Sequence, residues 1–149
     1  MITFRERCHH LWTIYLPGVI VAVGLFSIHT LVIYQTAKFL ASGAPDLTDL
    51  LGRGVAEPVM IIVSFLILFI THLAEAAVWA GLFMRSGQFK DFGECMYFAG
   101  TSLTALGYGD LVLQPPWRGL GPIMATNGIL MFGCSTAFLF VVIQHAWSI

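Results

Sequence analysis

The stretch TSLTALGYGDLVL, Thr101 to Leu113, places two glycines, a tyrosine and an aspartate near the end of an otherwise apolar chain. It follows a short segment of mixed polarity and precedes the last long apolar segment. Glycine adopts backbone conformations with positive φ that other residues avoid, so the part of this stretch around Gly107 and Gly109 is expected to be irregular rather than helical. The segments on either side of this glycine-rich region therefore determine how it is placed in the fold.

The composition is that of an integral membrane protein. Of the 149 residues, 58% are hydrophobic and only 10% are charged, and the mean hydropathy is +0.84. Soluble domains are less apolar and more highly charged. A net charge of −1 provides no electrostatic basis for binding nucleic acid. We therefore expect a chain whose surroundings are the lipid bilayer, with no nucleic-acid partner.

Three segments are long enough to cross a bilayer, which takes roughly 20 apolar residues. They run from Leu11 to Ala37, from Pro58 to Met84 and from Gly119 to Ile149. Aromatic residues lie toward their ends, as interfacial anchors do. The apolar region of the first segment is too long for a cleaved signal peptide, so we expect it to be retained. The linker after it is expected to hold at most a short helix, beginning near Asp46.

The chain between the second and third spans is too short for two further spans, yet its middle is apolar. Asp91, followed three residues later by Glu94, matches a capping box, which predicts a helix over 91–104. The glycines and Pro115–Pro116 prevent this helix from continuing. Irregular backbone at membrane depth is tolerated only where it is buried in protein or lines a water-filled cavity. We therefore expect the segment after this helix to coordinate something.

TSLTALGYGD resembles the selectivity filter of potassium channels, whose loops read Thr-Val-Gly-Tyr-Gly followed by Asp. In that family, four such loops line a narrow tube of carbonyl oxygens that replaces the hydration shell of the ion. Aligned on the Gly-Tyr-Gly-Asp at 107–110, the filter here covers 105–109. The ion-binding residues that the resemblance implies are Ala105, Leu106, Gly107, Tyr108 and Gly109.

The resemblance extends to both sides of the filter. The implied filter-support and outer-mouth residues are Tyr97, Phe98, Thr104 and Asp110. Arg118 matches the basic residue that opens the family's inner helix, and Gly128 follows it by ten residues, as in the family's hinge region. The implied cavity and gating residues are Gly128, Ile129, Phe132, Gly133 and Thr136. Ile129, Phe132 and Thr136 are spaced to share one helix face toward a water-filled cavity.

The function that the resemblance implies is passive conduction of potassium ions. One chain supplies one filter loop, so a closed tube requires several chains arranged symmetrically around it. The resemblance implies that these chains form a homotetramer in the bilayer. Ala105 replaces the filter threonine whose hydroxyls help form the innermost site, so that site is expected to be altered. Leu106 replaces valine and requires some repacking against the pore helix. We expect a potassium-selective or potassium-preferring cation channel, no catalytic residues, no cofactor, and no bound metal besides the permeant K⁺.

His72 and Glu75 lie three residues apart near the middle of the second span, so they share a helix face. Ionisable groups at that depth are costly and are candidates for function. The functional interpretations are a proton-sensitive gate, or a metal site that includes His29. The simpler interpretation, which we favour, is a hydrogen-bonded pair that fixes helix packing. An isolated His-x-x-Glu lacks the further ligands that metal sites supply.

These inferences predict an all-α membrane protein with three transmembrane helices, a re-entrant pore helix and a filter loop. Residues 1–57 form an extra N-terminal transmembrane helix and a connecting loop, and 58–149 form the pore domain. The elements expected within the pore domain are an outer helix over 58–84, a pore helix over 91–104, a filter over 105–109 and an inner helix over 119–145. We expect a multi-pass protein of the cell membrane, of the bacterial inner-membrane type.

Two rival functions and the orientation remain open at this stage. One rival is a nonconducting or weakly selective membrane subunit that keeps the pore fold. The other is an intramembrane metal protein or enzyme built on His29, His72 and Glu75. A filter that faces outward places most lysines and arginines outside, whereas the positive-inside rule favours the reverse. We expect the outward-facing filter.

Overall fold

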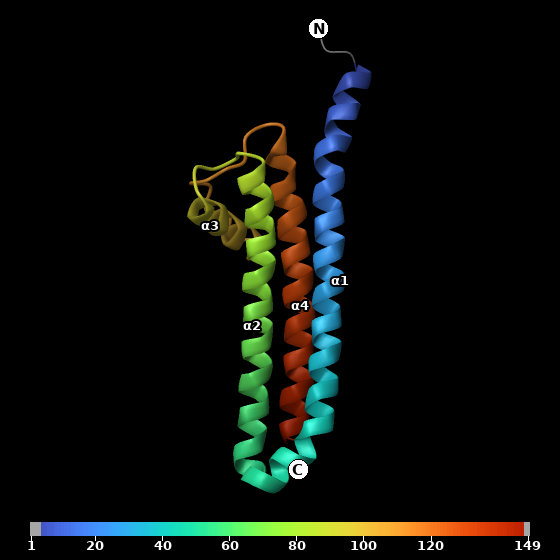
Figure 1. Cartoon of the computed structure of the whole chain (residues 1–149), viewed down its shortest axis with the longest axis vertical. Coiled ribbons are helices and arrows are strands. Elements are labelled where there is room, and N and C mark those ends of the chain that lie inside the picture. The colour runs from blue at the N-terminus through green and yellow to red at the C-terminus, as the bar shows by residue number, and fades with distance from the viewer. Residues whose placement is uncertain (1–3, 148–149) are drawn as a thin grey trace. The chain divides into compact units, whose positions relative to one another are not determined.

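The computed structural model describes residues 4–147, with the side chains of 4–11, 14, 44 and 147 left aside. The described part of the chain is almost entirely helical and contains no strand. Its elements are α1 (Phe4–Leu51), α2 (Arg53–Arg85), α3 (Phe92–Leu103), the short 3₁₀ helix η1 (Trp117–Gly119) and α4 (Leu120–Trp147) (Figure 1).

Three of these helices contain stretches long and apolar enough to cross a membrane. The candidate spans are Tyr15–Gly43, Arg53–Arg85 and Trp117–Ala146. All three exceed the roughly 20 residues that a hydrocarbon core requires. The all-helical membrane fold with three spans, predicted from the sequence, is therefore confirmed.

The prediction of a connecting loop before residue 58 is wrong. α1 continues as a helix through Pro45 to Leu51, and α2 begins at Arg53. Only Gly52, with a φ of 75°, separates the two helices. Its N–H donates to the carbonyl of Thr48 at 2.9 Å, and its own carbonyl accepts from the N–H of Ala56 at 3.0 Å. A single glycine in the left-handed region thus ends one helix and starts the next, which a polar, proline-containing linker does not reveal.

The chain divides into two compact units. The first contains the chain up to Phe26 together with Ala74–Leu130, and the second contains Ser27–Leu73 together with the chain from Met131. In the first unit, α3 lies beside the C-terminal end of α2 (Figure 1). Aromatic rings join them, since Phe98 of α3 meets Phe83 of α2 edge to face with ring centroids 5.3 Å apart. Edge-to-face pairs of this kind add specific geometry to apolar burial.

Small residues allow close helix contacts in the first unit. A Cβ added to Gly18 would overlap the side chain of Leu120, and one added to Gly119 would overlap the ring of Tyr15. In membranes, where lipid is as apolar as the side chains, such close packing is a principal source of helix association. The contacts of Gly18 and Gly119 therefore join the first part of α1 to the start of α4.

The second unit has a core that is notably polar for a membrane bundle. Its buried residues include His29, Thr36, Ser64 and Ser135. The hydroxyls of Thr36 and Ser64 donate to the carbonyls four residues earlier, at 2.8 Å and 2.7 Å, so they are satisfied within their own helices. His29 and Ser135 find their partners on other helices, as described below.

Candidate functional site

α3 begins as the capping-box pattern predicts. Asp91 has an extended backbone, and its side chain accepts a hydrogen bond from the N–H of Glu94 at 2.9 Å. The carboxylate of Glu94 reaches back and accepts from the N–H of Lys90 at 3.0 Å. These bonds satisfy amide groups at the start of the helix. They fix the first turn of α3 and with it the direction in which the helix leads to residues 105–109.

α3 ends immediately before residue 105. The hydroxyl of Thr104 donates to the carbonyl of Gly100 at 2.8 Å, so it is turned toward the helix. The N–H of Gly107 donates to the carbonyl of Thr101 at 3.1 Å and ties the following loop to the last turn of α3. The sign of φ then alternates from residue to residue. φ is 57° at Ala105, 51° at Gly107 and 81° at Gly109, whereas neither Leu106 nor Tyr108 has a positive φ.

This alternation has a geometric consequence. Helices and strands both keep φ negative at successive residues, so a segment whose φ alternates in sign continues neither element. Only glycine adopts a positive φ without cost, which accounts for Gly107 and Gly109, while at Ala105 the conformation costs roughly 1 kcal/mol. Residues 104–110 are all exposed in the single chain.

Tyr97 and Asp110 link α3 to the far end of this loop. The hydroxyl of Tyr97 donates to Oδ2 of Asp110 at 2.7 Å, and Oδ1 of Asp110 accepts from the N–H of Leu111 at 3.0 Å. The bond to Tyr97 favours the ionised carboxylate and lowers the pKa of Asp110 below its usual value. The same bond raises the pKa of the Tyr97 hydroxyl. The loop is therefore held at both ends by α3.

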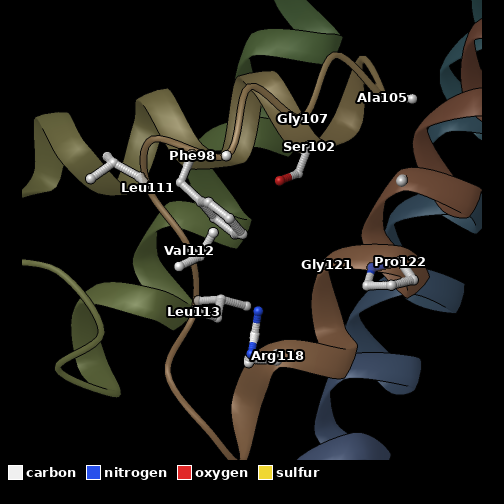
Figure 2. Close-up of a pocket in the computed structure, with 12 residues that line it drawn as sticks. Phe98, Ser102, Ala105, Gly107, Leu111, Val112, Leu113, Arg118, Gly121 and Pro122 are labelled. Carbon is white, nitrogen blue, oxygen red and sulfur yellow. The ribbon is translucent and has the colours of Figure 1, made fainter.

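A cavity of about 360 Å³ lies behind the loop (Figure 2). Phe98 and Ser102 of α3 line it, and the side chain of Arg118 extends into it from η1 (Figure 2). The remaining lining residues come from the loop, from Leu111–Leu113 and from the start of α4. Phe98, predicted as a support for the filter, is buried at 7% exposure. The structure therefore brings Phe98 and Arg118 to one space behind residues 105–109.

The residues expected in the cavity and gate occupy different environments along α4. Gly128 is buried, and a Cβ there would overlap the backbone carbonyl of Leu103. Ile129, Gly133 and Thr136 are exposed, and the hydroxyl of Thr136 donates to the carbonyl of Phe132 at 2.8 Å.

Phe132 is less exposed than Ile129 and Thr136. It is half-buried and stacks on the ring of His72, with centroids 4.2 Å apart.

His72 takes part in a polar cluster that sequence reasoning only partly identified. Its Nε2 lies 3.0 Å from Oγ of Ser135, and Nε2 of His29 lies 3.0 Å from the same oxygen. Ser135 was not among the predicted site residues. The only signal for it is a hydroxyl in the middle of an apolar span. Glu75, the expected partner of His72, lies one turn further along α2 and is buried at 3% exposure.

A comparison of the chain with known protein families indicates the kind of protein to which the loop and the helices around it belong. A family model described as an ion channel matches residues 59–145, more than half of the chain. The match covers most of α2 and α4 and all of α3 and the loop, whereas α1 lies outside it. No curated protein and no solved structure matches the chain.

Proposed function

Because the chain belongs to the ion channel family, we propose that it forms a homotetrameric channel in the cell membrane that conducts potassium ions through residues 105–109. The observation that carries the proposal is the alternating sign of φ at these five residues. In the proposed channel, the carbonyl oxygens of this segment replace the water around a potassium ion.

Two further features support this assignment. Residues 104–110 are exposed in one chain, as expected of a loop whose other walls come from three further copies. In addition, the C-terminus of α3 immediately precedes the filter, and helix C-termini carry partial negative charge. Four such helix ends around one axis favour a cation over an anion.

Conduction by this route is passive and involves no bond-making chemistry. An ion exchanges its water for carbonyl oxygens at the mouth near Asp110, moves between adjacent carbonyl sites, and leaves by mutual repulsion with the next ion. Ala105 supplies a carbonyl but no hydroxyl. We therefore expect a preference for potassium over sodium that is weaker at the innermost site than a threonine would give.

The test is ion flux into liposomes that contain the purified protein. We expect potassium to enter faster than sodium, and the bi-ionic reversal potential to follow the K⁺/Na⁺ ratio. Gly107→Asp should abolish flux, because it places a Cβ and a charge at a residue with positive φ. Gly24→Ala is the matched control, since a Cβ at that helical glycine meets nothing within 4 Å.

Two results would contradict the proposal. Flux that persists unchanged in Gly107→Asp would exclude residues 105–109 as the conduction path. Absence of flux in the wild type, together with a folded protein, would favour a nonconducting subunit that keeps the pore fold. The particle mass tests the assembly separately, since a tetramer has four times the chain mass of 16.4 kDa.

A further inference from the structure

The second unit contains two histidines that converge on one serine. His29 comes from α1, His72 from α2 and Ser135 from α4. Nε2 of each histidine lies 3.0 Å from Oγ of Ser135, and the two ring centroids are 4.9 Å apart. His29 is fully buried and Ser135 is 6% exposed. The proposed conduction path uses none of these side chains.

The hydroxyl of Ser135 bridges the two imidazoles. A serine hydroxyl has one hydrogen to donate and two lone pairs, so it can donate to one imidazole while it accepts from the other. It thereby holds the two ring nitrogens toward a common point. A ring nitrogen of His29 and one of His72 lie within 4.8 Å of each other.

We propose that His29 and His72 together bind a zinc-class transition metal ion within the membrane-spanning part of the protein. Neutral imidazole is a preferred ligand of Zn²⁺, at Zn–N distances of roughly 2.0–2.1 Å. Two nitrogens on a tetrahedral ion are about 3.4 Å apart. To share one ion the rings close slightly, and the imidazole whose Nε2–H donates to Ser135 moves that proton to its Nδ1, while the Ser135 hydroxyl either remains as a weak ligand or is displaced.

A carboxylate on α2 provides a negative charge that partly balances the charge of the ion. A dication in a medium of low dielectric constant needs a negative partner. Glu75 is three residues after His72, hence on the same face of α2, and is itself buried. Its carboxylate is the charged group that α2 offers next to the ligand His72.

Metal binding would clamp α1 to α2. The family match covers residues 59–145, so His72 lies inside it and His29 outside. The extra N-terminal helix thus contributes a ligand that the channel domain by itself lacks. This inference does not rest on ion conduction and is tested without it.

The experiment is titration of the purified, metal-stripped, full-length protein with Zn²⁺ by calorimetry. We expect one ion per chain and a loss of affinity of about tenfold or more in both His29→Gln and His72→Gln. His145→Gln is the matched control, because His145 is exposed on the last turn of α4 and should leave the affinity unchanged. Zn²⁺ should also raise the thermal unfolding temperature of the wild type but not of the two variants.

Ser135→Ala is a control that shows whether a substitution in this cluster by itself prevents folding. It removes the bridging hydroxyl but keeps both imidazoles, so we expect it to retain zinc binding. Affinity that is unchanged in His29→Gln and His72→Gln, or a wild type that neither binds Zn²⁺ nor is stabilised by it, overturns the proposal. The cluster is then a hydrogen-bonded packing contact.

Discussion

The strongest influence on the ionisation of Asp110 is the hydroxyl of Tyr97. The hydroxyl of Tyr97 donates to its carboxylate, which lowers the pKa of Asp110 below its ordinary value. A carboxyl whose pKa is lower in the folded than in the unfolded state stabilises the fold above the unfolded pKa. That stabilisation is lost as the pH falls through the folded pKa. The bond between α3 and the outer end of the loop is therefore expected to weaken in acid.

Tyr97→Phe tests this linkage. At neutral pH we expect the variant to unfold at a lower temperature than the wild type, because it lacks the bond to the Asp110 carboxylate. The difference should shrink as the pH falls through the pKa of Asp110, since a protonated carboxyl no longer gains from the bond. The measurement is the thermal unfolding temperature of both proteins in detergent across the acid range.

Tyr34→Phe is the control for loss of a phenolic hydroxyl. Tyr34 is an exposed residue of α1, far along the chain from Asp110, so its removal should leave the acid dependence unchanged. A difference between Tyr97→Phe and the wild type that stays constant with pH would show that the hydroxyl acts through packing rather than through the charge of Asp110.

At the scale of the helix, α4 packs closely against the end of α3 near the loop. Gly128 lies against the backbone carbonyl of Leu103, where no Cβ fits. Backbone cannot move aside as a flexible side chain can, so a larger residue must separate the two helices. The position that the sequence suggested as a hinge is therefore a close-packing contact that sets the distance between α4 and α3.

Gly128→Ala and Gly133→Ala form a matched pair on α4. Gly128→Ala should lower the free energy of unfolding by about 1–3 kcal/mol, because it overpacks the contact with Leu103. At Gly133 a Cβ meets nothing within 4 Å, and alanine should raise the free energy of unfolding by up to about 1 kcal/mol through helix propensity. Unfolding titrations in mixed micelles measure both. Equal effects of the two substitutions would contradict the packing role of Gly128.

The elements that local chemistry specifies could be predicted from the sequence. The capping box of Asp91 and Glu94 predicts a helix over 91–104, and α3 covers Phe92–Leu103. The spans follow from the length of apolar segments, so they too are local properties. The junction of α1 and α2 was missed because a proline and a polar run usually end a helix, whereas here α1 continues past Pro45 to Leu51 and ends only at Gly52.

The contacts between helices could not be predicted in the same way. Ser135 lies 63 residues after His72 and 106 after His29, and no spacing rule connects residues on three different helices. The link between Tyr97 and Asp110 is shorter in sequence but depends on how the loop returns past α3. The resemblance pointed to both residues, yet the hydrogen bond between them required the fold.

At the scale of the whole molecule, the distribution of lysine and arginine bears on the orientation in the membrane. With three spans, the loop between α2 and α3 lies on the side opposite to the junction of α1 and α2. Most of the basic residues are on the side of the loop between α2 and α3, and the positive-inside rule would make that side cytoplasmic. Arg118 does not count fully toward that rule, since it lines the cavity behind residues 105–109 rather than a free loop.

Because the resemblance to potassium channels places this loop on the outer side, we expect the side of residues 105–109 to face outward, against the count of basic residues, and single cysteines to label accordingly. In a chain whose three native cysteines are replaced, Ser86→Cys reports the filter side and Asp46→Cys the other side. A membrane-impermeant maleimide added to intact cells should modify Ser86→Cys, and should modify Asp46→Cys only after the membrane is permeabilised. If Asp46→Cys is modified in intact cells while Ser86→Cys is protected, the positive-inside rule prevails and the filter side is cytoplasmic.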